Sequence, residues 1–176
     1  KQRYAITYSD AINCFLPPGK PAAEGKQKEP YKDIEGNYTQ PDALTGEQRI
    51  AADAIKSAID EGRQENFLIH GVTASGKTEI YMNMIEKIIS EGKQAIILVP
   101  EISLTGQLIE RFVGRFGKEA IAVMHSRLTQ RERYDEWQRI RSGKAKIVIG
   151  ARMGVFAPLA NIGAIIMDEE HEASYK

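Results

Sequence analysis

The stretch Gly71-Val72-Thr73-Ala74-Ser75-Gly76-Lys77-Thr78 decides which fold this chain is expected to adopt. Two glycines bracket four residues and are followed by lysine and threonine, which is the spacing G-x-x-x-x-G-K-S/T. The glycines allow a tight turn in which successive backbone N–H groups point inward at phosphate oxygens. Lys77 can reach the β- and γ-phosphates, and the Thr78 hydroxyl can bind Mg²⁺. The sequence therefore predicts a nucleotide-phosphate site. The alternative is a glycine-rich strand-to-helix turn with an exposed lysine.

The segments around this loop predict an α/β fold with a mostly parallel sheet. Strands are expected at 66–70, 95–99, 120–125, 145–150 and 163–167, and helices at 77–90, 103–116 and 129–141. Capping-box spacings at Thr45 and Thr129 mark the starts of two helices, the first of which ends near Gly62. The runs 95–99 and 162–167 are apolar throughout, which is typical of strands buried on both faces. Ligands bind at the carboxyl ends of such strands.

The composition excludes several classes of protein and site. No apolar run among the 176 residues approaches the ~20 needed to span a bilayer, so no membrane segment is predicted. The single cysteine, Cys14, excludes an intramolecular disulfide and a multi-cysteine zinc cluster, so we expect no zinc site and a cytoplasmic location. Lys+Arg and Asp+Glu balance at 24 each, so nucleic acid must bind through a local surface. The chain lacks an initiator methionine, and we expect it to be a segment of a longer protein.

A second candidate site, Asp168-Glu169-Glu170-His171, directly follows the last predicted strand. A carboxylate at this edge of the sheet is where a second group for Mg²⁺ is expected in a phosphate-loop protein. Asp168 would hold the metal through water, and Glu169 would orient and polarise the water that attacks a phosphoanhydride. The alternative is a solvated acidic end of a strand.

Together these motifs resemble the family of primosomal helicases called PriA. The resemblance covers about 44–176 and is carried by the phosphate loop with Glu79, by 99–105, His125-Ser126, Arg131-Glu132-Arg133, Trp137, 147–152 and 155–158, and by DEEH with Ser174-Tyr175-Lys176. It implies a RecA-like P-loop NTPase lobe that binds ATP and Mg²⁺. The lobe would belong to a 3′-to-5′ DNA helicase of replication restart. Its partners would be DNA, a second helicase lobe, and primosome and replisome proteins.

The resemblance also implies roles for individual residues. Lys77, Asp168 and Glu169 would be catalytic, and Thr78 and Asp168 would hold Mg²⁺. The nucleotide would be bound by Gln48 at the adenine edge, by the loop residues Gly71, Val72, Thr73, Ala74, Ser75, Gly76, Lys77 and Thr78, and by His171, which couples the site to the other lobe. DNA would be contacted by Glu101, Ser103, Thr105 and Arg152. The sequence departs from the family in three places. Ala74 replaces glycine, Gly106 replaces proline, and 151–154 replaces a Thr-Arg-Ser-Ala type of run.

Three parts of the chain are expected. Residues 1–19 would be a short helical remnant of a DNA-binding domain, 20–43 a polar linker, and 44–176 an incomplete ATP-binding lobe. Two other interpretations stay open. One is a non-catalytic remnant that binds nucleotide or DNA. The other is a small P-loop transferase, because 73–78 also resembles the loop of tRNA isopentenyl-type transferases, although such enzymes need no DEEH.

Basic side chains are frequent between residues 127 and 146, where they outnumber acidic ones seven to three. We expect a solvated helix face there, with contact to the DNA backbone as the alternative. Trp137 is expected in the core rather than stacked on a base. His125 could face DNA or be structural, and the sequence does not decide between the two.

Overall fold

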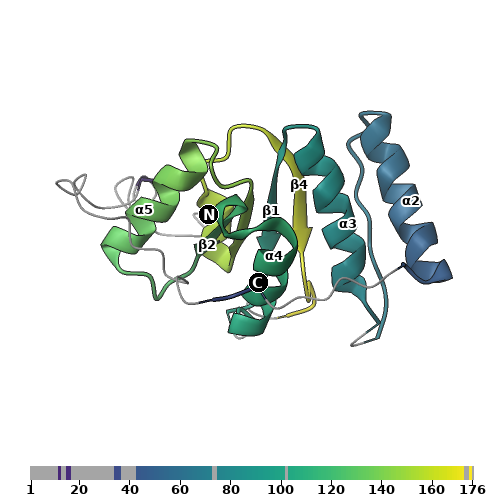
Figure 1. Cartoon of the computed structure of the whole chain (residues 1–176), viewed down its shortest axis with the longest axis horizontal. Coiled ribbons are helices and arrows are strands. Elements are labelled where there is room, and N and C mark those ends of the chain that lie inside the picture. The colour runs from purple at the N-terminus through teal and green to yellow at the C-terminus, as the bar shows by residue number, and fades with distance from the viewer. Residues whose placement is uncertain are drawn as a thin grey trace, which may run out of the picture.

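The computed structural model describes residues 12, 15, 16, 34–36, 43–72, 75–101, 103–172 and 175. These residues form a four-stranded sheet with helices on both faces (Figure 1). The elements are α2 (Gly46–Asp60), α3 (Lys77–Ser90), β1 (Gln94–Leu98), α4 (Gly106–Phe116), η1 (Lys118–Ala120), β2 (Ile121–Met124), α5 (Gln130–Arg141), β3 (Ile147–Gly150), η2 (Arg152–Phe156) and β4 (Ile162–Met167). The predicted α/β class is confirmed. The expected parts 1–19 and 20–43 lie almost entirely outside the described residues.

All strand pairs of the sheet are parallel, in the order β2-β3-β1-β4. The central strand β1 pairs on one side with β3, where Ile97 lies opposite Ile149, and on the other with β4, where Ile97 lies opposite Ile166. Parallel strands end at a common edge. The loops that follow all four strands therefore lie at one side of the sheet, as expected for a ligand-binding edge.

The two faces of the sheet bury separate hydrophobic clusters. Helices α3 and α4 cover one face, where Ile85 and Phe112 are fully buried with Ile97. Helix α5 covers the other face, where Ile140 packs with Val148. Every residue of β1 is buried, so the predicted strand with two buried faces is confirmed there.

Both predicted capping boxes are present. The Thr45 side chain accepts a hydrogen bond from Gln48 N while the Gln48 side chain accepts one from Thr45 N, and Thr129 and Glu132 repeat this exchange before α5. Helix α4 begins at Gly106 rather than at Ser103, because the Thr105 side chain caps it by accepting from Leu108 N. The residues before Thr105 therefore belong to the loop that follows β1.

One predicted strand is absent, and the predicted burial of another strand is wrong. Residues 63–70 form no strand, and the Phe67 and Leu68 side chains are 42% and 79% exposed. A short apolar run becomes a strand only where a neighbouring strand pairs with its backbone. Within the described part of the chain, the sheet pairs β4 with β1 alone. The predicted burial of both faces of β4 is also wrong, because Ile165 is 63% exposed. Ile165 lies on the same face of the sheet as α5, but α5 packs on β2 and β3 and does not reach β4.

The prediction of a solvated basic face is wrong for Arg139, which is 5% exposed. Its guanidinium lies 2.6 Å from the carboxylate of Glu136, which is 1% exposed, and it donates to the Ile121 carbonyl oxygen at 2.9 Å. Glu136 also accepts from Val123 N at 2.7 Å. The pair therefore fastens α5 to the start of β2. Trp137 is 8% exposed, so its predicted place in the core is confirmed.

Replacing Gly106 with proline is expected to stabilise the fold by about 0.4–1 kcal/mol. Gly106 is the first residue of α4, where proline is favoured, and the preceding Thr105 has φ −99° and ψ 161°, the extended backbone that precedes proline. A β-carbon at Gly106 meets nothing within 4 Å. Urea unfolding of the two proteins measures the change. A midpoint lowered by proline would contradict this account of the helix start.

Candidate nucleotide site

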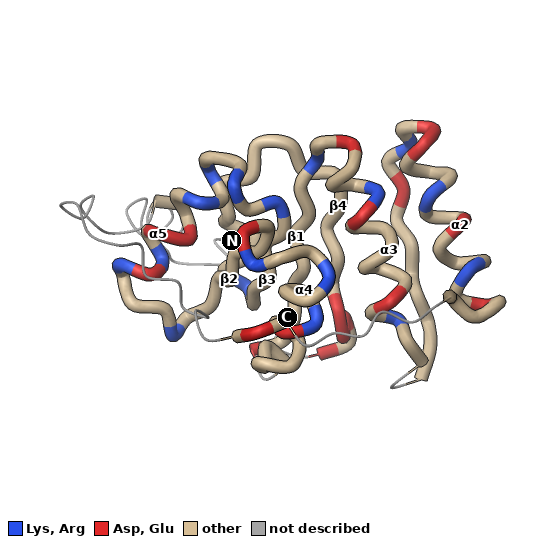
Figure 2. Tube along the Cα trace, viewed as in Figure 1, with Lys and Arg blue, Asp and Glu red and all other residues tan. Residues whose placement is uncertain are grey.

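The loops at the carboxyl edge of the sheet bring the predicted site residues together. Asp168 N donates to the Leu98 carbonyl oxygen at 2.9 Å, so the pairing of β4 with β1 extends to the first residue of the DEEH motif. Figure 2 shows the acidic residues that follow β4 at the same end of the sheet as the start of α3. The two predicted motifs therefore share one edge, although 90 positions separate Thr78 from Asp168 in the sequence.

The phosphate loop is described except for Thr73 and Ala74. Gly76 has φ +82°, a left-handed conformation that favours glycine, and a β-carbon there would collide with the Gln48 side-chain nitrogen. Lys77 Nζ donates to the carbonyl oxygens of Gly71 at 2.6 Å and Val72 at 3.0 Å. These bonds fold the lysine back across the loop at the N-terminus of α3, where an anion is stabilised.

Gln48, the predicted adenine-reading residue, lies against the phosphate loop. Its side-chain Nε2 donates to the Ser75 carbonyl oxygen at 3.0 Å, and its Oε1 accepts from Thr45 N. One side chain therefore caps α2 and contacts the loop that precedes α3. This contact joins two segments that are 27 positions apart in the sequence.

Tyr81 connects the two predicted Mg²⁺ ligands. Its hydroxyl oxygen lies 3.1 Å from Thr78 Oγ1 and 3.0 Å from Asp168 Oδ2. Since a phenol has one proton, Tyr81 donates it to the carboxylate and accepts from the threonine hydroxyl. Burial and the negative charge of Asp168 raise the pKa of Tyr81, so it stays a donor at neutral pH. Sequence reasoning missed Tyr81, although its position three residues after Thr78 places both on one face of α3.

Glu169, the predicted catalytic base, contacts a predicted DNA-binding residue. Ser103 Oγ donates to Glu169 Oε2 at 2.9 Å. Glu169 has φ 51°, and it is the one non-glycine residue in the described part of the chain with a positive φ. Its N–H lies 3.1 Å from Asp168 Oδ1. The loop after β1 and the turn after β4 are therefore joined by side chains, which the sequence alone did not indicate.

The remaining predicted residues lie at the same edge of the sheet. The Thr105 hydroxyl oxygen caps α4. Glu101 is exposed in the loop after β1, and Arg152 is exposed at the start of η2, which follows β3. His171 is exposed in the turn after β4. From the end of the motif, Tyr175 donates to the Asp168 carbonyl oxygen at 3.0 Å, and burial and the Asp168 charge raise the pKa of Tyr175 to about 12. The structure thus fixes the Asp168 backbone from two sides.

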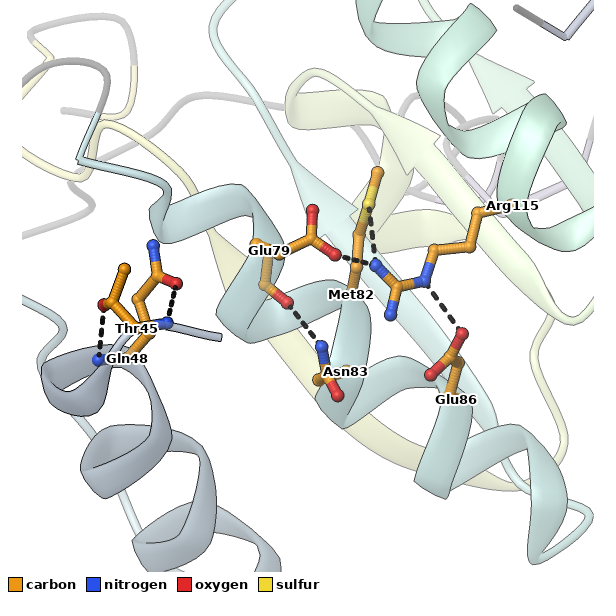
Figure 3. Close-up of polar contacts among 7 residues, drawn as sticks. All are labelled: Thr45, Gln48, Glu79, Met82, Asn83, Glu86 and Arg115. Atoms are coloured by element: carbon orange, nitrogen blue, oxygen red, sulfur yellow. Dashed lines mark hydrogen bonds and ion pairs between the residues drawn. The ribbon is translucent and has the colours of Figure 1, made fainter. Parts of the chain in front are cut away.

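An ion pair network ties α4 to the first turn of the phosphate-loop helix. Figure 3 shows Arg115 of α4 reaching Glu79 and Glu86 on α3, and the Arg115–Glu86 distance is 2.8 Å. The Arg115 side chain is 1% exposed, and its Nη2 has no hydrogen-bond partner among the described residues. Glu79 follows Thr78 directly. The last turn of α4 therefore fixes the start of α3 through Arg115. The first turn of α4 directly follows the loop that contains Ser103.

The residues present fit a magnesium nucleotide. A hydroxyl and a carboxylate held 3.0–3.1 Å from one phenol are oxygen ligands, which Mg²⁺ prefers, and few protein ligands are needed because phosphates and waters complete its shell. Among the described residues there is no group of three or more His, Cys, Asp or Glu side chains arranged to hold a metal ion. In the same part of the chain, no helix has the length and apolar character needed to cross a membrane.

Replacing Tyr81 with phenylalanine is expected to weaken Mg²⁺-dependent ATP binding about fivefold, which corresponds to ~1 kcal/mol for one hydrogen bond. The Asp168 carboxylate would lose its donor and its fixed orientation. Calorimetric titration at several Mg²⁺ concentrations measures the effect. Tyr134→Phe is the matched control, because that hydroxyl accepts from Gln138 on α5. Equal affinities of the two variants would contradict the assigned role.

Comparison with known proteins supplies the family. The family described as DEAD/DEAH box helicase matches residues 48–176. The chain is similar to proteins called replication restart protein PriA from Bacillus subtilis strain 168 (49% identity over 172 residues, 97% of this chain) and Treponema pallidum strain Nichols (48% over 134 residues, 76% of this chain). A third relative of this name, from Haemophilus influenzae, is 54% identical over 110 residues, or 62% of this chain. The matched regions are 21%, 20% and 15% of the lengths of these relatives, so the chain spans about a fifth or less of each.

Proposed function

Because the chain belongs to the DEAD/DEAH box helicase family, we propose that it is the ATP-binding lobe of an ATP-dependent 3′-to-5′ DNA helicase of replication restart. The proposal rests on one observation: the Tyr81 hydroxyl forms hydrogen bonds with both Thr78 and Asp168, which brings the two motifs together. The role in replication restart is proposed because the relatives are called replication restart proteins. With that role we propose a cytoplasmic location.

The chemistry proposed for the site is hydrolysis of ATP to ADP and phosphate. Lys77 would leave its two carbonyl partners and bind the β- and γ-phosphates, and Thr78 and Asp168 would hold Mg²⁺. When bound, Mg²⁺ would neutralise part of the phosphate charge. Glu169 would take a proton from water as the water oxygen bonds to the γ-phosphorus and the bond to the β–γ bridging oxygen breaks.

Roles for two further residues, Gln48 and His171, are proposed from where they lie in the structure. Gln48 would exchange its contact with Ser75 for the adenine edge, since its side chain already lies against the phosphate loop. Exposed His171 would carry the state of this site to a second lobe. Residues 44–176 would form the lobe, with 20–43 as a linker and 1–19 as part of a DNA-binding domain.

DNA is proposed to lie across the loops that follow β1 and β3. The segments that follow these two strands hold the four predicted DNA-binding residues, Glu101, Ser103, Thr105 and Arg152. Ser103 is half-buried, and the other three are exposed. The formal net charge of the chain is zero, so affinity for single strands should be low and should fall with salt. Primosome and replisome proteins are further proposed partners, because the relatives carry the name replication restart protein.

The isolated chain is proposed to bind ATP with little turnover. An arginine from a second lobe contributes a factor of about 10³–10⁵ to the rate in related phosphoryl transfer, and the relatives are roughly four to five times as long as this chain. A non-catalytic role in binding nucleotide or DNA is therefore the second candidate.

The test is ATP hydrolysis by the full-length protein that carries this chain, with and without single-stranded DNA. We expect DNA to stimulate turnover and the protein to separate strands. Tight ATP binding with no turnover in either condition would favour the non-catalytic candidate.

A further inference from the structure

We propose that the hydrogen bond between Ser103 and Glu169 is a latch on ATP hydrolysis that DNA releases. In this account Ser103 is a positioning residue. It holds the carboxylate of Glu169 in a resting orientation until a DNA phosphate takes the serine hydroxyl. The inference rests on the proposed function, because it assigns regulation to the same nucleotide site.

The contact is a short, solvent-exposed hydrogen bond to a carboxylate. Ser103 Oγ lies 2.9 Å from Glu169 Oε2, and hydrogen bonds to an ionised carboxylate are roughly twice as strong as those between neutral groups. The two residues are 66 positions apart and lie in the segments that follow two different strands, β1 and β4. The bond therefore joins the loop proposed to touch DNA with the residue proposed to activate water.

The backbone at Glu169 has a conformation that a non-glycine residue keeps only where its surroundings hold it. Its φ of 51° places a non-glycine residue in the left-handed region, which L-residues adopt at a cost of order 1–3 kcal/mol where surrounding contacts hold them. Two contacts hold this residue: its carboxylate accepts from the Ser103 hydroxyl, and its N–H donates to the Asp168 carboxylate. When the serine leaves, the turn loses one of these contacts and can relax, which would move the carboxylate.

Ser103 has one hydroxyl proton, so it cannot donate to the Glu169 carboxylate and to a DNA phosphate at the same time. The backbone around Ser103 is fixed, since its N–H donates to the Pro100 carbonyl oxygen and its carbonyl oxygen accepts from Thr105 N, both at 2.9 Å. The hydroxyl therefore chooses its acceptor by rotation about one bond. A serine donates one hydrogen bond, so it serves either the carboxylate or a phosphate. A phosphate at hydrogen-bond distance would also repel the nearby carboxylate.

Ser103→Ala is expected to separate this role from a structural one. Without the latch, turnover in the absence of DNA should rise about tenfold, because a hydrogen bond to a charged group is lost from the resting state. Turnover at saturating DNA should stay within about twofold, so the stimulation ratio should fall by about tenfold. Ser103→Thr keeps the hydroxyl and should restore DNA dependence. A residue that only supports the fold would lower both rates together.

The experiment is steady-state ATP hydrolysis by the full-length protein, without DNA and with a saturating single-stranded oligonucleotide. The variants are Ser103→Ala, Ser103→Thr and the double variant Ser103→Ala/Glu169→Gln, with Ser90→Ala at the far end of α3 as the matched control. The double variant should be inactive, which would show that the added basal turnover uses Glu169. If the wild type is stimulated by DNA but Ser103→Ala has unchanged or lower basal turnover, the latch is wrong and the proposed function stands. If the wild type hydrolyses no ATP in either condition, the proposed function fails and the latch fails with it.

Discussion

Replacing Arg139 with methionine is expected to lower the free energy of unfolding by ~3–5 kcal/mol. The variant removes the guanidinium from the Glu136 carboxylate, which stays buried at 1% exposure and still accepts from Val123 N. It also removes donors from the Ile121 carbonyl oxygen at the start of β2. The cost is large because the buried carboxylate loses its cationic partner and regains no hydration in exchange. Urea unfolding of the chain, followed by circular dichroism, measures it.

Two further variants make this expectation specific. Arg141→Met removes a neighbouring arginine that is exposed and lies 4.9 Å from the centre of the Trp137 ring, so its loss should be about 0.5–1 kcal/mol. The double variant Glu136→Gln/Arg139→Met should recover part of the loss, because no buried charge remains. Equal losses for Arg139→Met and Arg141→Met would contradict the buried pair.

Replacing Glu169 with glutamine is expected to reduce DNA-stimulated ATP turnover in the full-length protein by about 10²–10⁴-fold. The amide keeps the shape of the side chain but cannot accept a proton from water. ATP binding should remain, because Lys77, Thr78 and Asp168 are unchanged. Turnover and calorimetric affinity, measured on the same preparation, separate the two effects.

The matched control is Glu170→Gln, which makes the same change of charge at the next position of the motif. Glu170 is exposed in the turn after β4, and we place it outside the site. Its turnover should stay near that of the wild type. A loss of turnover in Glu170→Gln as large as in Glu169→Gln would show that net charge matters here rather than a base at one position.

The elements that sequence predicts well are those with local causes. The threonines Thr45 and Thr129 start helices because their hydroxyls accept from N–H groups three residues ahead, and that spacing is visible in the sequence. The central strand β1 is apolar at four of its five positions and buried at all of them. The phosphate loop and DEEH are also local patterns. The two motifs lie at the same edge of the sheet because parallel strands all end at one edge.

The elements that sequence misses depend on distant partners. Arg139 is buried by its pairing with Glu136 and by carbonyl oxygens around β2, and no local pattern distinguishes it from the exposed Arg141. The contact of Tyr81 with Asp168 and that of Ser103 with Glu169 each join residues that are far apart in the sequence, by 87 and 66 positions. The segment 66–70 is apolar enough for a strand, but a strand requires a neighbour, and composition does not supply that information.

Calorimetric titration of the chain with Mg²⁺ and ATP tests the central claim most directly. The claim is that the loop before α3 and the turn after β4 form one nucleotide site. We expect one ATP per chain, and Lys77→Ala should weaken binding at least tenfold by removing the charge-assisted contact to the phosphates. Lys87→Ala is the matched control, because that lysine pairs with Asp60 near the other end of α3 and should leave the affinity unchanged. Equal ATP affinities for wild type and Lys77→Ala would contradict the account.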